Sequence, residues 1–266
     1  MKKIIFSMFL SLCLVYTATA QLGEGQTDPD VTNKRGAYIL PVQGDFALGF
    51  DALPVMSFFT SPVEFEQYTI IGKYFLENDR ALRVSLGIGV NSETNKDLVS
   101  PNPAPTPSDP TKDQRVIDVS RESETFLGLS VGYELRRGQG RVQGFYGGEF
   151  GLAVYSRSEK NEWGNNLSAT NTNSFNPRLL ERSYGTAFSV GLGGFVGAEY
   201  FIAPKLSIGA EMSLGFYFTT WGEGEENLES WNGTAISKRT QRVDGGGSAF
   251  DIETRPGASI FFTFHF

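Results

Sequence analysis

The chain has 266 residues, enough for one large β domain, and its 31 glycines and 22 phenylalanines suit strands better than helices. It carries 30 acidic against 23 basic residues, and such an acidic chain is a poor partner for nucleic acid. Its single cysteine, Cys13, lies close to the N-terminus, so the rest of the chain has no disulfide, thiolate metal site or cysteine nucleophile.

Residues 1–20 have the organisation of a secretory signal peptide. Lys2 and Lys3 precede the apolar run Ile4–Tyr16, which is too short to span a bilayer as a helix. Small residues follow at Ala18-Thr19-Ala20, so we expect cleavage before Gln21. A short anchor and lipoprotein processing at Cys13 are the less favoured alternatives. Residues 21–43 are polar and predict an N-terminal periplasmic segment with little regular structure.

Apolar residues alternate with small or polar ones in eight stretches between residues 44 and 266. Successive side chains of a strand point to opposite faces, so this period of two predicts eight strands. In chain order they are marked by Phe46, Leu48 and Phe50; by Tyr68, Ile70, Tyr74 and Leu76; by the even positions of Leu82–Val90; by the odd positions of Thr125–Leu135; by Val142, Tyr146, Phe150, Leu152 and Val154; by Phe188–Tyr200; by the even positions of Leu206–Phe218; and by a last strand from near Phe250 to Phe266.

The last two strands show the pattern most clearly. Every second residue of Leu206–Phe218 is apolar, and the run is long enough to cross a bilayer at a tilt, which takes ~9–11 residues. The chain ends with Phe262, Phe264 and Phe266 on one face of the final strand. A terminal aromatic in this setting is typical of an outer-membrane barrel, and we interpret the three phenylalanines as its C-terminal assembly signal.

Short and long connections alternate along the chain. The short ones are residues 77–79, 137–140 and 202–205. The long ones are the apolar Ala52–Glu66, the proline-rich 91–122, the asparagine-rich 158–180 and the acidic 221–247. An up-and-down barrel with tight periplasmic turns and longer outer loops predicts this alternation, whereas a soluble secreted β-sandwich, the alternative, does not. We therefore expect an all-β, transmembrane antiparallel barrel of eight strands over residues 44–266.

The signal sequence, the loop lengths, the terminal phenylalanine and the stretch Gly197–Lys205 together resemble a known class of proteins. They are similar to the small eight-stranded outer-membrane barrels of the OmpA and OmpX type, and to the porin-like barrel family of Bacteroidetes-type bacteria. The resemblance covers most of residues 44–266. It implies a place in the outer membrane of a Gram-negative cell envelope, with outer-membrane lipid and the barrel-assembly machinery as partners. It is specific for architecture rather than for activity.

The faces opposite the apolar ones carry charges of both signs. Eight strands leave an interior just wide enough to be filled by side chains, where a lone charge is costly. We therefore expect ion-pair networks that close the lumen to most solutes, with a narrow pore as the alternative. The residues placed inside are Asp45, Lys73, Arg83, Glu134, Arg136, Arg141, Glu149, Glu199, Glu211 and Arg255.

Tyr155 lies near the outer end of its predicted strand. We expect it on the outside of the barrel, in an aromatic girdle at the outer membrane interface.

The sequence predicts no enzyme, cofactor or metal site. The only histidine, His265, is the penultimate residue, and a catalytic triad or a zinc site needs more than one such group at hand. The carboxylates of residues 221–247 lack the spacing of a Ca²⁺ loop. The expected role is structural or surface interaction, and no motif identifies an extracellular ligand. The alternatives are a narrow passive channel for small solutes, a barrel that handles lipid or hydrophobic ligands through Leu53–Phe59, and, least favoured, an outer-membrane hydrolase.

Overall fold

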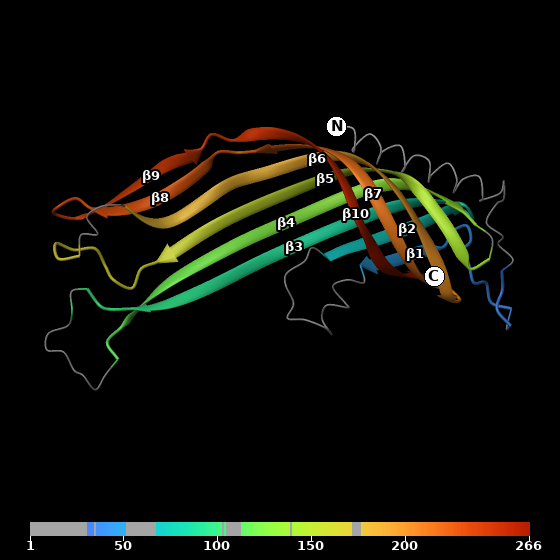
Figure 1. Ribbon diagram of the computed structural model, residues 1–266, viewed down its shortest axis with the longest axis horizontal. Helices are drawn as coiled ribbons and strands as arrows, with labels where there is room; N and C mark the ends of the chain where they lie inside the picture. The colour runs from blue at the N-terminus through green and yellow to red at the C-terminus, as the bar shows by residue number, and fades with distance from the viewer. Residues whose placement is uncertain are drawn as a thin grey trace, which may run out of the picture.

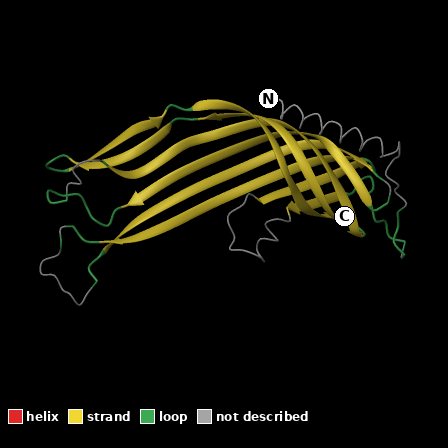
Figure 2. Cartoon of the chain, viewed as in Figure 1, coloured by secondary structure: helices red, strands yellow, loops and turns green. Residues whose placement is uncertain are grey.

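The computed structural model describes residues 31–34, 36–51, 68–102, 104, 113–138, 140–171 and 177–266; within these ranges the side chains of Asp51, Tyr68 and residues 253–259 are not described. The apolar connection Ala52–Glu66, including Leu53–Phe59, lies outside the described residues. Strands make up nearly all of the described chain (Figure 2). No helix among the described residues is long and apolar enough to cross a membrane.

Eight strands close into an antiparallel ring, which confirms the predicted barrel. In ring order they are β5 (Val142–Glu162), β4 (Val116–Arg137), β3 (Arg80–Val99), β2 (Tyr68–Glu77), β1 (Phe46–Asp51), β10 (Gly247–His265), β7 (Leu206–Trp221) and β6 (Arg178–Ala203). Pairing of β5 with β6 completes the ring, and the first strand meets the last through β1 and β10. Closure leaves the membrane part without the free sheet edges that hydrocarbon does not tolerate.

Three tight turns lie at one end of the barrel, between β2 and β3, β4 and β5, and β6 and β7. We call this the turn end and the opposite end the loop end. In the last of these turns Lys205 has a positive φ of 60°, which is uncommon for a residue with a side chain. Its ammonium forms an ion pair with Asp45, which helps to hold this turn against the start of β1.

The outward faces of the ring carry the apolar residues that the alternation indicated. Leu129 on β4, Leu192 on β6 and Phe216 on β7 keep 48%, 62% and 45% of their surface exposed. A continuous exposed apolar surface of this kind is unfavourable in water and favourable against lipid tails. The register across β4, β5, β6 and β7 places Leu129, Leu152, Val190 and Phe218 in one row, so the apolar band runs around the wall.

Four strands of the ring run far beyond the apolar band. Residues predicted as long loops are instead strand, because β3 continues to Val99, β4 starts at Val116, β5 continues to Glu162 and β6 starts at Arg178. The acidic stretch 221–247 was also expected to be a loop. It forms the hairpin of β8 (Gly224–Trp231) and β9 (Ile236–Asp244), and this hairpin pairs with β6. Figure 1 shows these six strands projecting as one curved sheet past the ends of β1 and β2, and we call it the extension. Outside the membrane both faces of a strand meet water, so the apolar period that marks the wall is absent there.

The N-terminal segment also differs from the expectation of little structure. Thr32 and Tyr38 form an isolated bridge, and the carbonyl of Ile39 accepts a hydrogen bond from the Lys205 amide at 3.2 Å. Ile39 and Leu40 are buried against Phe201 at the turn end. Two adjacent apolar residues are too short a run to predict a packed segment, which explains why the sequence did not indicate this contact.

Candidate functional site in the barrel lumen

A network of two cations and two anions crosses the lumen near the turn end. Lys73 on β2 lies 2.9 Å from Glu134 on β4 and 3.2 Å from Glu199 on β6, measured between its ammonium and the carboxylate oxygens. Arg136 on β4 bonds to Glu134 at 2.6 Å and also pairs with Glu199. All four side chains are at most 2% exposed. Two positive and two negative charges therefore neutralise one another in a buried layer.

Aromatic rings complete this layer, and with the four charged residues we call it the plug. The Lys73 ammonium lies 4.8 Å from the Phe145 ring centre, and the Arg136 guanidinium 5.4 Å from that of Phe75. Phe75 and Phe145 are almost fully buried. Below the plug, Phe201 and the segment with Ile39 and Leu40 cover the turn end. A cation held against ring faces and between carboxylates is firmly placed, so the plug is a packed layer rather than a set of mobile side chains.

A second ion pair lies one layer nearer the loop end. Arg83 on β3 donates from both terminal nitrogens to the two carboxylate oxygens of Glu211 on β7, with one contact at 3.0 Å. The guanidinium also stacks at 4.4 Å over the Phe195 ring. The two terminal nitrogens of Arg83 match the carboxylate in shape, and its Nε donates to the Ser85 hydroxyl at 3.4 Å.

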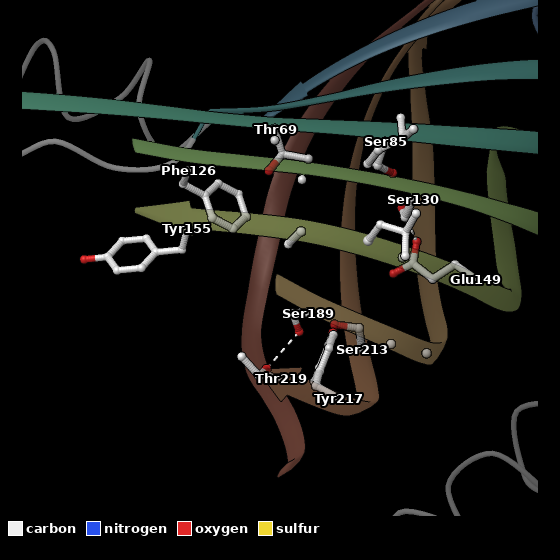
Figure 3. Close-up of a pocket in the computed structure, with 18 of the residues that line it drawn as sticks. Thr69, Ser85, Phe126, Ser130, Glu149, Tyr155, Ser189, Ser213, Tyr217 and Thr219 are labelled. Atoms are coloured by element: carbon white, nitrogen blue, oxygen red, sulfur yellow. Dashed lines mark hydrogen bonds between the residues drawn. The ribbon is translucent and has the colours of Figure 1, made fainter. Parts of the chain in front are cut away.

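Above this pair the lumen holds a cavity of about 890 Å³, which we call the cup. Its wall is rich in hydroxyl groups and small residues, as Figure 3 shows, and it includes Thr69, Ser85, Ser130, Ser189, Ser213 and Thr219. Ser189 accepts a hydrogen bond from Thr219 at 3.0 Å. Asp251 on β10 and Tyr155 on β5 line the cup and are exposed, so its mouth reaches solvent. The volume is within the range of sites for small ligands.

Glycines keep the cup open by letting aromatic rings lie flat against its wall. A Cβ at Gly191 or Gly215 would overlap the ring of Tyr217, and one at Gly87 or Gly128 would crowd the ring of Phe126. Without these glycines the rings would have to turn into the lumen. The close backbone approach is therefore what preserves the space.

Glu149 on β5 lines the cup and forms no salt bridge among the described residues. It accepts one hydrogen bond, from Ser130 at 3.1 Å, and it is half-buried. Of the described side chains that line the cup, Arg83 is the single cation, and it is already bound by Glu211. The described wall of the cup therefore combines carboxylates, hydroxyls and ring faces with one cation, Arg83.

The structure brings most of the ten predicted lumen residues into these layers. Asp45 instead lies at the turn end with Lys205. Arg141 lies apart from the network, where its guanidinium donates to the carbonyls of Phe201 and Ile202 at 3.2 Å. The side chain of Arg255 is outside the described part of the structure, although its backbone pairs with Ser213 on the adjacent strand.

Sequence reasoning missed the aromatic wall of the cup. Tyr155 was expected outside the barrel, yet it pairs in register with the inward-facing Phe126 and lines the cavity. Tyr217 also lines the cup, although it stands on the polar face of an otherwise regular alternation. The signal that could have identified such residues is a glycine two positions away on the same face, as Gly215 is to Tyr217.

The acidic hairpin of the extension pairs with arginines of β6. Arg178 bonds to Glu229 at 2.5 Å and to the Asn165 carbonyl at 2.6 Å, and Arg182 pairs with Glu226. Hydrogen bonds with Tyr184 and Glu226 raise the pKa of Arg182 above its ordinary value. In the described part of the chain no cluster of histidine, cysteine, aspartate and glutamate has the arrangement of a metal site. These carboxylates hold the extension together.

The single histidine has a hydroxyl neighbour but no access for a substrate. His265 Nε2 lies 3.3 Å from the Ser207 hydroxyl, and the ring packs 5.1 Å from that of Phe201. Both residues are buried below the plug, and His265 Nδ1 has no hydrogen-bond partner in the described structure. A nucleophile–base pair needs a third orienting group and space for a reacting carbonyl, and this pair has neither among the described residues.

Comparison with known proteins identifies the family. A family model for OmpA-OmpF-like porins matches residues 61–222. No curated protein matches the chain. Among solved structures, the outer membrane protein OprG from Pseudomonas aeruginosa aligns with a TM-score of 0.31 and 10% identity over 86% of this chain and 98% of its own. Outer membrane protein W from E. coli aligns with a TM-score of 0.31 and 10% identity over 85% and 100%. Likenesses of that strength transfer no property to this chain.

The family match extends over more than half of the sequence and covers β2 to β7, which form most of the wall and carry the plug. It agrees with a closed ring of eight antiparallel strands, a lipid-facing apolar band and a charged lumen. The chain therefore belongs to the OmpA-OmpF-like porin family and is a β-barrel protein of the outer membrane.

Proposed function

We propose that this protein is a non-conducting barrel with a structural and surface-interaction role, anchored in the outer membrane and presenting the cup and the extension to the exterior. The observation that carries the proposal is the plug. Lys73, Glu134, Arg136 and Glu199 fill one cross-section of the lumen, and none is more than 2% exposed. An ion that passed this layer would have to break contacts that leave a charge buried and unpaired, which is strongly unfavourable.

The extension supports the surface-interaction part of the proposal. In barrels of this kind the tight turns lie on the periplasmic side, so the turn end faces the periplasm and the extension faces outward. β4 begins at Val116, about ten residues before the apolar band at Leu127, which corresponds to roughly 30 Å of strand beyond the lipid. Ion pairs such as Arg178–Glu229 hold this sheet in one shape, as a recognition surface requires.

No catalytic role is part of the proposal. The Ser207–His265 pair is buried beneath the plug, and no nucleophile–base pair faces the cup among the described residues. A second candidate function, a narrow passive channel, is favoured by one observation: the cup of about 890 Å³ already occupies the loop-end part of the lumen. For conduction the plug would have to open. The two functions therefore differ in whether the plug stays closed or opens.

Single-channel recording in planar lipid bilayers tests the proposal. The purified full-length barrel should give no steady current, because the plug fills a cross-section of the lumen. Lys73→Ala/Glu199→Ala removes one charge of each sign and keeps the plug neutral, so it serves as the opened control and should conduct. Glu122→Gln, in the extension, should stay silent. A steady, voltage-independent current through the unmodified protein would establish the channel instead.

A further inference from the structure

We infer that the outward face of the extension binds anionic, phosphate-bearing lipid head groups of the surrounding membrane. The residues that carry the inference are Lys96 on β3, Arg121 on β4 and Lys160 on β5, which we call the basic cluster. All three side chains are exposed. The inference goes beyond the proposed closed lumen and does not depend on whether the barrel conducts, because the basic cluster and the plug lie in different parts of the molecule.

The outward face of the extension continues the lipid-facing face of the barrel. β3, β4 and β5 pass from the wall into the extension (Figure 1), and their pairing shows no shift of register over this length. Each cation is six positions from an exposed apolar residue of its own strand, and these residues are Val90, Leu127 and Val154. An even separation along a regular strand keeps two side chains on one face. The basic cluster therefore lies on the surface that meets lipid lower down.

The three strands repeat one order of side chains on this face. From the barrel outward, each strand has an apolar residue, then two hydroxyl residues and then a cation. The hydroxyl residues are Ser92 and Thr94, Thr125 and Ser123, and Ser156 and Ser158. Apolar side chains suit lipid tails, hydroxyls can donate hydrogen bonds to phosphate oxygens, and cations bind phosphate by charge. This order matches the layers of a membrane surface.

The distance of the basic cluster from the apolar band suits the head-group layer. Six positions correspond to about 20 Å along a strand, and a strand tilt of about 40° turns this into roughly 15 Å of height. Head groups extend about 5–8 Å beyond the hydrocarbon on each side. Lysine and arginine side chains can point back towards the membrane, and charges interact over about 8 Å at physiological salt. Phosphates of the head-group layer are therefore within reach.

The cations of the basic cluster have no acidic partner in the described part of the chain. Arg121 stands directly opposite Lys160, and like charges in this arrangement destabilise a sheet. The other neighbour of Arg121 in register is Thr94, and Lys96 lies opposite Val119. No salt bridge joins any of the three cations to another described residue. An anion from outside the chain would remove the repulsion between Arg121 and Lys160.

Two carboxylates share the outward face and leave an excess of positive charge. Glu162 ends β5, and Glu181 on β6 lies opposite Lys160 but accepts a hydrogen bond from Asn227 at 3.3 Å. The inward face has the opposite charge, because the register places three carboxylates in one row: Glu93, Glu122 and Glu159. An acidic protein would have to displace the lipid that surrounds the wall below, so we assign the outward face to lipid head groups.

Urea unfolding of the full-length barrel in vesicles tests the inference through the stability that bound lipid adds. The vesicles contain phosphatidylcholine alone, or phosphatidylcholine with a minor fraction of phosphatidic acid, whose head group is a phosphate. We expect phosphatidic acid to raise the folding equilibrium constant of the unmodified barrel. Arg121→Gln/Lys160→Gln should reduce this gain by about fivefold for each cation removed. Higher salt should also reduce the gain, because the attraction is Coulombic.

The matched control is Lys238→Gln/Arg239→Gln on β9, which also removes one lysine and one arginine from exposed positions of the extension. It should keep the full gain from phosphatidic acid. In phosphatidylcholine alone, Arg121→Gln/Lys160→Gln should be at least as stable as the unmodified barrel, because it removes a repulsion. Lys96→Gln leaves that pair intact and should lose about fivefold of the gain, so it decides the question if the double variant fails to fold.

Four results would overturn the inference: no gain from phosphatidic acid in the unmodified barrel, an equal gain in Arg121→Gln/Lys160→Gln, an equal loss in the β9 control, or the same gain in phosphatidylcholine vesicles from added inorganic phosphate. The last result would indicate a site for the free ion instead of a lipid. None of these outcomes bears on conductance, so failure of the lipid site and failure of the closed lumen are distinguishable.

Discussion

Replacing Glu199 by glutamine should destabilise the barrel by removing one of the two negative charges of the plug. Glu199 lies 3.2 Å from the Lys73 ammonium, pairs with Arg136 and is 3.5 Å from the Thr263 hydroxyl that donates to it. Glutamine keeps the size of the side chain but presents an amide donor to groups that are themselves donors. Two cations would then share Glu134 alone, and the buried layer would carry a net positive charge.

The cost follows from burial. Breaking a buried ion pair by removing one partner typically costs about 3–5 kcal/mol, because the remaining charge is left without compensation or solvent. Glu122→Gln is the matched control: its carboxylate pairs with Arg157 at 3.2 Å, but the two side chains are 50% and 39% exposed. Loss of an exposed pair of this kind costs about 0–1 kcal/mol. The expected difference between the two variants is therefore large compared with the error of an unfolding experiment.

Urea unfolding of the barrel refolded into phospholipid vesicles, followed by tryptophan fluorescence, measures both free energies. Adding Lys73→Met to Glu199→Gln restores neutrality, so the double variant should be more stable than the sum of the single effects by about 1–3 kcal/mol. The reasoning is refuted if Glu199→Gln unfolds within about 0.5 kcal/mol of the unmodified barrel, or if it costs no more than Glu122→Gln.

Three further outcomes are expected. Gly197→Val should prevent formation of the detergent-resistant, heat-modifiable form on gels, because a Cβ there overlaps the Phe145 ring; normal mobility would contradict this contact. Leu129→Arg should destabilise the barrel in vesicles by about 2–4 kcal/mol by placing a charge in the apolar band, and an unchanged unfolding midpoint would show that this face does not meet lipid. Ile39→Ser/Leu40→Ser should detach the N-terminal segment and make it sensitive to limited proteolysis, and protection equal to that of the unmodified chain would exclude the packing at the turn end.

The membrane part of the fold could be predicted from the sequence because lipid imposes a simple rule on it. Each wall strand must show apolar side chains on one face, so Leu206–Phe218 reads as a strand without any knowledge of its neighbours. The extension follows no such rule. Residues 91–98 are exposed on both faces, and their strand structure depends on pairing with β4, which local periodicity does not report.

The sequence predicts which residues face the lumen but not which of them form ion pairs with one another. Alternation alone places Lys73, Glu134 and Glu199 inside, whereas their meeting depends on the shear of the closed ring, which brings β2, β4 and β6 to one level. The cup was not predictable, because it results from rings that fold back onto glycines. Tyr155 shows the limit most clearly: an aromatic near a strand end fits an interfacial girdle as well as a cavity wall.

The accessibility of single cysteines in intact cells tests most directly whether the lumen is closed below the cup. Ser213 and Ser207 belong to the same strand, β7, but Ser213 lines the cup and Ser207 is fully buried below the plug. A membrane-impermeant maleimide added outside should label Ser213→Cys and leave Ser207→Cys at the background of the unmodified protein. Labelling of Ser207→Cys at the rate of Ser213→Cys would show that the lumen is open from end to end.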